Sequence, residues 1–448
     1  MERRCKISNF FDICKKKPFP IVRNCHFLDS KDTIKPCCFA LRDLSNNYSE
    51  MKHQRKRVIV SVTNDLVTDQ RVHRSCMAMH QAGYEVLLVG RRLPTSAPVK
   101  RPYATARMRL LFRRKAFFYA DYNFRLFWRL LFTRADLFYA NDTDVLPANY
   151  LAAWLRRKPL FFDAHEMFPE VPELVGRPRV KAVWQRIEDC LFPRMARRPH
   201  TAAVTVCRSI ADRYAERYGL TMDVVRNVPM RQPSEPAADA RRRADALLAS
   251  LPADRQLLLY QGAVNVGRGV DWVMAAMPHL DGCHLVVAGV GDEYERLHQQ
   301  ALQEPYCHCV TFLGRVEPAV LRLITPHAAL GLSLLENRGL NYYYSLPNRL
   351  ADFVQASVPV LATDFPEIHR LVATYEIGTL VPPEPFDPVS RRTPPPDARK
   401  LADTIRQSLH FWQSLPADER RRRFDRAAAD LSWENDKNIL LQQLQTII

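Results

Sequence analysis

Short apolar runs alternate with helical periodicity twice along the chain, and this alternation limits the possible folds more than any other feature. Strands that alternate with helices form parallel sheets, and strands that are apolar almost throughout are covered by helices on both faces. We therefore expect an α/β fold with two doubly wound domains facing a cleft, where ligands bind beyond the carboxyl ends of the strands. The predicted strands are VIVSV, YEVLLVG, DLFYA, PLFFDA, AAVTV and MDVVRNV, followed by LLLYQG, CHLVVAG, VTFLG, ALGLSLL and VPVLAT.

The chain has 448 residues, enough for two domains of ordinary size. The predicted divisions are a first domain over 57–230, a linker with a solvated helix over 231–254, a second domain over 255–410 and final helices over 411–448. Residues 1–50 lack sustained periodicity, and a basic run, KHQRKR, follows Met51, so the segment before the first domain is taken as 1–56. We expect a disordered extension there or, preferably, a true start at Met51.

Composition excludes some classes of protein. No uncharged apolar run approaches the roughly 18 residues that cross a bilayer, and the basic start lacks the apolar core of a secretion signal, so a cytoplasmic protein is expected. The eleven cysteines form no paired array of metal-ligand spacing, so we expect reduced thiols and no metal site. The formal charge of +17 predicts anionic partners, whether nucleotide phosphates, nucleic acid or an acidic membrane face.

A helix start is predicted in the stretch YSLPNRLADFVQASVPVLATDFPEI, which begins at Tyr344. Ser345 and Asn348 are residue types that cap helices, and Pro347 is tolerated in a first turn. Unpaired N–H groups and the positive end of the helix dipole, with Arg349 one turn in, favour phosphate binding. An ordinary capped core helix is the competing interpretation.

This stretch resembles the nucleotide-sugar region of GT-B glycosyltransferases of the family-four type, and the likeness covers most of 57–440. The run SVTNDLVTDQRVHRSC closely resembles bacterial members of this group that act in cell-surface polysaccharide synthesis. The resemblance implies two Rossmann-like domains and a final helix that crosses back to the first. It implies that Asp352 binds the nucleotide ribose and that the helix start at Ser345, Asn348 and Arg349 binds the diphosphate. It also implies retaining, metal-independent transfer with no cofactor, the nucleotide-sugar being the substrate.

A glycine-containing loop, YQGAVNVGRGVDW, follows the first predicted strand of the second domain. Gly262 and Gly269 let the backbone approach a ligand, and Arg268 brings charge to a helix start. By the resemblance, Arg268 neutralises the leaving diphosphate. A second cation of the family falls on Ala263, so Arg349 is expected to substitute for it.

Two further positions are assigned by the resemblance alone. Gly314, in FLGRV, ends a strand whose backbone contacts the base. Glu336 lies sixteen positions before Asp352, farther than the usual spacing of the family's two acids. We expect an inserted loop to bring Glu336 to the donor sugar, the alternative being that this role is lost.

In the first domain, polar residues follow predicted strands. Asp142, with Asp144, mimics the metal-binding DxD of another glycosyltransferase architecture, but two Rossmann-like halves argue against it. Asp144 is expected to cap a helix, and Asp142 to face the cleft. His165 and Glu166, in FFDAHEMFPE, are predicted to bind a sugar or acceptor hydroxyl, or else to form a buried pair.

The loop after the first strand, SVTNDLVTDQR, brings Asp69 and Arg71 toward the cleft. The competing interpretation is that Asp69 merely caps a helix and that Arg71 is solvated.

The segment RMRLLFRRKAFFYADYNFRLFWRLLF is both basic and aromatic. Such helices can lie in a bilayer interface, although a core helix with one polar edge fits equally well. We expect a glycan or lipid-linked acceptor at the cytoplasmic membrane face, and no nucleic acid. The alternatives are a sugar-nucleotide epimerase of the same architecture and a non-catalytic basic scaffold on membrane or nucleic acid.

Overall fold

The computed structural model describes residues 55–67, 69–112, 115–171, 174, 176–230, 237–385 and 394–448. The extension expected before residue 56 lies almost entirely outside the described residues, as does the start of the expected linker.

The first sheet has seven parallel strands in the order β3-β2-β1-β4-β5-β6-β7. They are β1 (Arg57–Ser61), β2 (Glu85–Arg92), β3 (Ala104–Arg109), β4 (Leu137–Asn141), β5 (Leu160–Ala164), β6 (Thr201–Thr205) and β7 (Asp223–Val224). The helices between them are α3 (Gln70–Gln81), α4 (Lys115–Phe132), α5 (Leu146–Leu155), α6 (Pro178–Ala196) and α7 (Arg208–Tyr218).

The second sheet has six parallel strands in the order β10-β9-β8-β11-β12-β13. They are β8 (Gln256–Gln261), β9 (Cys283–Ala288), β10 (Val310–Gly314), β11 (Leu330–Ser333), β12 (Val360–Thr363) and β13 (Gly378–Val381). The helices that accompany them are α8 (Ala238–Ala249), α9 (Val270–Ala276), α10 (Tyr294–Ala301), α11 (Pro318–Ile324), α12 (Leu340–Tyr343), α13 (Asn348–Gln355) and α14 (Pro366–Tyr375).

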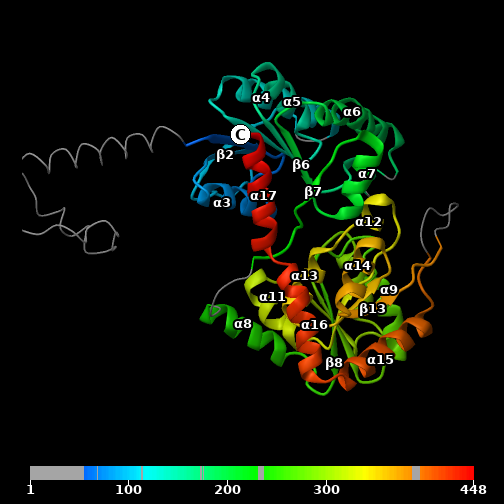
Figure 1. Cartoon of the computed structure of the whole chain (residues 1–448). Helices are drawn as coiled ribbons and strands as arrows, with labels where there is room; N and C mark the ends of the chain where they lie inside the picture. The colour runs from blue at the N-terminus through cyan, green and yellow to red at the C-terminus, as the bar shows by residue number, and fades with distance from the viewer. Residues whose placement is uncertain are drawn as a thin grey trace, which may run out of the picture. The chain divides into compact units, whose positions relative to one another are not determined.

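Both sheets are covered on both faces, as the apolar strands predict. Alternate residues of β1 enter different cores, because successive side chains of a strand point to opposite faces. Val58 and Val60 pack in the core that includes side chains of α3, whereas Ile59 packs with Phe118 and Tyr122 of α4. The two-domain α/β fold with doubly wound parallel sheets is confirmed (Figure 1).

The final helices are α15 (Ala398–Ser414), α16 (Ala417–Asp430) and α17 (Trp433–Ile447). Helix α17 lies against α3 and β6 of the first sheet, whereas α16 packs on α13 and α14 of the second (Figure 1). The Arg226 guanidinium joins them, 2.8 Å from the Asp430 carboxylate and 3.0 Å from that of Asp436. The chain therefore crosses back between the domains at its C-terminal end.

Several local expectations are corrected. Strands β3 and β13 were not predicted, because ATARMR and GTLV lack a run of large apolar residues. Helix α8 is not simply solvated, since its Ala240 and Ala244 pack against α11.

The start of α13 also differs in detail from the prediction. Pro347 itself occupies the N-cap position, which has no side-chain cap bond. The Ser345 hydroxyl instead donates to the Tyr342 carbonyl, at 2.9 Å.

Among the described residues, no helix is both long and apolar enough to cross a membrane.

Candidate functional site

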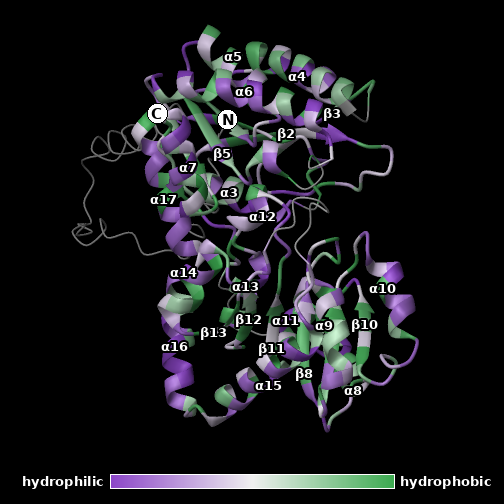
Figure 2. Cartoon of the chain, turned by 90° about the vertical axis from the view of Figure 1, so that its right-hand side faces the viewer, coloured by the Kyte–Doolittle hydropathy of each residue, from purple (hydrophilic) through white to green (hydrophobic). Residues whose placement is uncertain are grey.

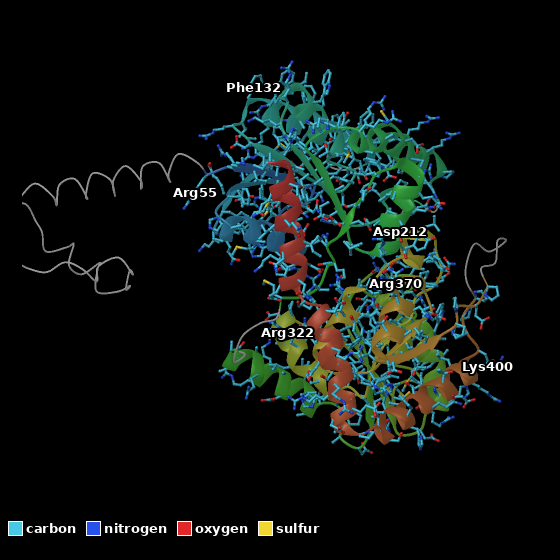
Figure 3. All side chains as sticks on the ribbon, viewed as in Figure 1. Arg55, Phe132, Asp212, Arg322, Arg370 and Lys400 are labelled. Atoms are coloured by element: carbon cyan, nitrogen blue, oxygen red, sulfur yellow. The ribbon has the colours of Figure 1, made fainter. Side chains whose placement is uncertain are left out.

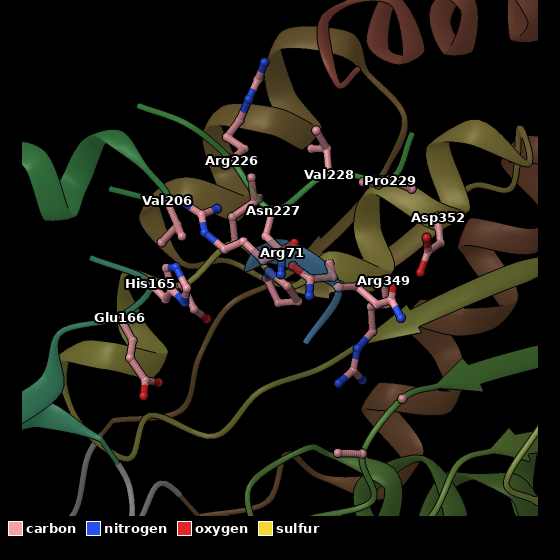
Figure 4. A pocket seen from close by; sticks show the side chains of 18 of the residues that line it. Arg71, His165, Glu166, Val206, Arg226, Asn227, Val228, Pro229, Arg349 and Asp352 are labelled. Atoms are coloured by element: carbon pink, nitrogen blue, oxygen red, sulfur yellow. The ribbon is translucent and has the colours of Figure 1, made fainter. Parts of the chain in front are cut away.

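A cavity of about 700 Å³ lies between the carboxyl ends of the two sheets. Its first wall, from the first domain, carries Arg71, Arg74, His165, Glu166 and Asn227. Its second wall carries Gly262, Arg268, Ser345, Asn348, Arg349 and Asp352. Figure 4 shows His165 and Glu166 on one side of this space, with Arg349 and Asp352 on the other.

Two arginines of the second wall stack on tyrosine rings. The Arg349 guanidinium carbon lies 4.3 Å from the Tyr260 ring centroid, and that of Arg268 lies 4.6 Å from the Tyr342 ring centroid. Within the described part of the chain, neither guanidinium forms an ion pair with a carboxylate. The second wall therefore holds two positive charges that form no ion pair with a carboxylate of the described residues.

Arg349 is held inside this wall and is only 7% exposed. Burial lowers its pKa, and the neighbouring charge of Arg268 lowers it further. Its Nη1 atom is buried and has no hydrogen-bond partner among the described residues. An anion in the cavity would relieve this cost, because a buried unpaired donor or charge is expensive.

Glycines shape the loop that carries Arg268. Gly262 has φ of +122°, and a Cβ there would lie 3.6 Å from Nη2 of Arg349. Gly269, the N-cap residue of α9, has φ of +69°, and a Cβ there would lie 2.7 Å from the Leu334 Cβ. Both positions therefore favour glycine, which tolerates positive φ and brings no side chain.

Asp352 projects from α13 and lines the cavity. The Gln261 side-chain N–H donates to Asp352 Oδ2 at 3.2 Å. The Gln261 Oε1 atom in turn accepts from the Thr325 hydroxyl at 2.9 Å. Burial raises the Asp352 pKa. The carboxylate is thus oriented by a neighbour and can accept hydrogen bonds from a hydroxylated ligand.

On the first wall, Arg71 and His165 contact buried carboxylates. Arg71 lies 2.5 Å from Asp163 Oδ1 and donates to the Val225 carbonyl at 2.8 Å. Oδ2 of Asp163 accepts from the Tyr139 hydroxyl at 2.9 Å and lies 3.4 Å from His165 Nε2. Asp69 caps α3, as the competing interpretation held. The expectation in that interpretation that Arg71 is solvated is wrong, because Arg71 is only 5% exposed.

His165 connects this network to Asp142. Its Nδ1 lies 3.2 Å from Asp142 Oδ2, and its backbone N–H donates to Oδ1 at 2.7 Å. Although burial alone lowers it, Asp142 and Asp163 raise the pKa of His165 to about 10. Burial alone would raise the pKa of Asp163, but the charges of Arg71 and His165 outweigh it and hold that pKa well below its usual range. The imidazole is therefore a cation and a hydrogen-bond donor at neutral pH.

Glu166 meets the second domain across the cavity. The Asn341 side-chain amide, on α12, donates to Glu166 Oε2 at 3.3 Å, and its oxygen accepts from the Met167 backbone N–H at 3.0 Å. The stretch before Ser345 therefore contacts the first wall.

Four of the predicted site residues lie outside the cavity lining: Asp142, Gly269, Gly314 and Glu336. Glu336 is 7% exposed, lies 3.1 Å from Arg338 and donates its backbone N–H to the Gly267 carbonyl. It thus supports the glycine loop. Asp142 orients His165, and Gly314 ends β10 with φ of +64°.

Asp144 does not cap α5, because Val145 holds that position and Asp144 instead accepts from the Thr63 hydroxyl at 2.6 Å. Burial and the nearby Asp142 raise the pKa of Asp144 to about 7.

Sequence reasoning missed the two tyrosines beneath the arginines, as well as Arg74, Arg226 and Asn341. Tyr260 lies in a predicted strand and Tyr342 in the YYY run before Ser345, so both looked like core residues. Arg74 donates to Asn227 and lies over the Trp433 ring, a contact between segments far apart in the chain.

Two family descriptions match the chain in tandem. "Glycosyltransferase Family 4" matches residues 68–229, and "Glycosyl transferases group 1" matches residues 255–410. These segments contain nearly all of the two sheets and most of the cavity lining. No curated protein sequence matches this chain.

Solved structures with this fold span nearly the whole described chain. Sucrose-phosphate synthase from Thermosynechococcus elongatus has a TM-score of 0.65 at 17% identity, covering 87% of this chain and 98% of its own. HepE of Anabaena, solved with UDP-glucose, has a TM-score of 0.61 at 13% identity and coverages of 87% and 99%. WaaG, a glycosyltransferase involved in lipopolysaccharide biosynthesis, gives 0.53 at 16% identity, with coverages of 86% and 99%.

The tandem matches, the two facing parallel sheets and the cavity between their carboxyl ends agree with one another. The chain belongs to the GT-B glycosyltransferases of the family 4 and group 1 type.

Proposed function

We propose that the enzyme transfers a sugar from a nucleotide-sugar to a hydroxyl of a glycan or lipid-linked acceptor, with retention of anomeric configuration and without a metal ion. The observation that carries the proposal is the pair of cavity arginines, Arg268 and Arg349, which no described carboxylate neutralises. A nucleoside diphosphate supplies the matching negative charge.

The donor would lie along the second wall. Its diphosphate would contact Arg268, Arg349 and the start of α13, where backbone N–H groups and the helix dipole favour anions. Asp352, held by Gln261, would accept hydrogen bonds from the ribose hydroxyls. HepE, which shares the fold, was solved with UDP-glucose, so UDP-sugars are the first donors to test.

The two guanidinium groups would supply the charge that a divalent cation supplies in other transferases. Negative charge grows on the diphosphate as the bond to the sugar breaks, and fixed cations stabilise this charge most effectively in a site that excludes water. Retention of configuration is proposed on the resemblance of the SLPNRLADF stretch to family four.

The acceptor would lie on the first wall. Glu166 can accept from an acceptor hydroxyl, beside the His165 imidazole, whose two ring nitrogens face Asp142 and Asp163. WaaG, another protein of this fold, acts in lipopolysaccharide biosynthesis, which supports a surface glycan or its lipid-linked precursor as acceptor.

A thermal-shift panel of UDP-, GDP- and ADP-sugars tests donor binding, because a ligand that binds only the folded state raises its stability. We expect one nucleotide series to raise the melting temperature. NMR of the product of that donor with a glycan acceptor, in the presence of EDTA, then gives the anomeric outcome and the metal requirement. An inverted product, or activity abolished by EDTA and restored by Mg²⁺, would contradict the mechanism.

The competing activities give distinct results in the same assays. An epimerase would convert the sugar of the donor with no acceptor present. A scaffold would give no thermal shift with any nucleotide-sugar.

A further inference from the structure

Helices α4 and α5 expose aromatic and aliphatic side chains that a monomer in water would ordinarily bury. Phe132 is 78% exposed, Phe124 65% and Trp154 59%. Most of the exposed large apolar side chains among the described residues lie on these two helices and the segment just before α4. We call Phe117, Phe124, Trp128, Phe132, Trp154 and Leu155 the α4–α5 patch.

The patch is continuous along α4. Phe124, Trp128 and Phe132 recur every four residues and therefore share one face of the helix. The ring centroids of Phe124 and Trp128 are 6.2 Å apart, and those of Trp128 and Phe132 are 5.8 Å apart and stacked. Such a ladder of rings facing outward does not serve the domain core, because the core face of α4 is formed by Phe118, Tyr122, Leu126 and Leu130.

Helix α5 extends the patch sideways. The Arg156 guanidinium donates to the carbonyls of Leu130 and Thr133 at 2.5 and 2.6 Å, which fixes the end of α5 beside the end of α4. Trp154 and Leu155 immediately precede that arginine. The green segments of both helices lie together in Figure 2, and Phe132 projects outward in Figure 3, on the side of the first sheet away from the second.

The segments that carry the patch are rich in basic residues. Residues 109–136 and 146–158 together contain ten Lys or Arg and only two Asp. Both acids are engaged: Asp121 lies 2.5 Å from Arg125, and Asp136 lies 3.4 Å from Lys158. Exposed Arg129 and Arg134 have no carboxylate partner among the described residues. Exposed rings within a basic border complement a surface that is negatively charged outside and apolar beneath.

We infer that the α4–α5 patch docks the enzyme on an anionic lipid bilayer, with the aromatic rings inserted among the acyl chains and the arginines at the headgroups. Aromatic side chains favour the membrane interface, and a basic border adds attraction to anionic lipids. The inference does not depend on the identity of the donor, since the patch is separate from the cavity lining.

Vesicle sedimentation with the full chain tests this inference. The enzyme is expected to sediment with phosphatidylglycerol–phosphatidylcholine vesicles and far less with phosphatidylcholine alone, and 0.5 M salt should weaken the binding. The variant Phe124→Ser/Phe132→Ser/Trp154→Ser should lose about tenfold or more in partition coefficient. The matched control, Leu302→Ser/Phe411→Ser, removes exposed apolar side chains of α15 and of the end of α10, and should bind as the wild type does.

All variants retain the basic residues before position 55, so the difference between them reports the patch alone. Equal melting temperatures and equal nucleotide-induced shifts establish that the triple variant is folded. Wild type that fails to bind anionic vesicles, or a folded triple variant that binds them equally well, would overturn the inference. So would a concentration-dependent dimer in light scattering that the triple variant abolishes, since a second copy would then cover the patch.

Discussion

The two walls of the cavity contain similar residue types but treat positive charge differently. On the first wall, Arg71 and His165 are paired with Asp163 and Asp142. On the second wall, Arg268 and Arg349 lie over tyrosine rings and have no carboxylate partner among the described residues.

This difference indicates a division of labour. A buried cation paired with a carboxylate contributes to stability, because removing either partner leaves the other as an unpaired buried charge. A cation kept in place by an aromatic ring retains its charge for a ligand. On the first wall, Arg71 and His165 are therefore locally neutralised, whereas Arg74 lies over the Trp433 ring without a carboxylate partner among the described residues. On the second wall, Arg268 and Arg349 are both available to an anion.

The largest effect is expected from breaking the pair on the first wall. Arg71→Met should destabilise the folded protein by about 3–5 kcal/mol, because it leaves the fully buried Asp163 without its cation. Urea denaturation monitored by circular dichroism measures this loss. A change below 1 kcal/mol would mean that Tyr139 and His165 satisfy Asp163 without Arg71.

The next effect concerns the chemical step. Arg268→Ala should lower kcat on the order of 100-fold with little loss of stability, because the charge acts on the leaving diphosphate. Steady-state kinetics with the donor found by thermal shift gives the value. Arg296→Ala, an exposed arginine on α10 that is paired with Glu293, is the matched control and should leave kcat unchanged. Undiminished kcat in Arg268→Ala would remove this residue from the mechanism.

A smaller effect is expected from pH on the first wall. The pKa of His165 is raised from its ordinary value to about 10, so its charge pairing stabilises the folded state fully below pH 6.5. That stabilisation declines as pH rises from 6.5 toward 10, because the folded state then gives up the proton that it holds more tightly than the unfolded chain does. The stability gap between wild type and His165→Gln should therefore narrow between pH 6.5 and 9.5. A gap that does not narrow over this range would show that the folded protein holds His165 neutral.

The smallest effect on stability is expected where the same substitution is made on the second wall. Arg349→Met should change the free energy of unfolding by no more than about 1 kcal/mol, in either direction, because no carboxylate is stranded. The same variant should weaken binding of the nucleoside diphosphate about tenfold or more. Destabilisation as large as that of Arg71→Met would show that the walls do not differ.

Much of this contrast could not be seen in the sequence. The alternation of strands and helices predicted both sheets, since apolar runs such as VIVSV and CHLVVAG can be buried in few other ways. The SLPNRLADF stretch and the glycine loop placed six of the predicted residues on the second wall. Which carboxylate meets which arginine depends on strand order, and Arg71 and Asp163 are 92 positions apart.

The contacts that hold each site side chain in place could not be predicted from the sequence either. Tyr260 and Tyr342 look like core residues until the arginines are seen above them. Glu336 was expected to reach the donor sugar, but its contact with Arg338 depends on the path of the inserted loop, which no periodicity describes.

The central claim is that the second wall binds the diphosphate through two unneutralised arginines. Isothermal titration of the preferred nucleoside diphosphate and of its nucleoside, with wild type and with Arg268→Ala/Arg349→Met, tests it most directly. The account predicts that wild type binds the diphosphate at least about tenfold more tightly than the nucleoside, and that the ratio falls to near one in the double variant. An unchanged ratio in a folded double variant would contradict it.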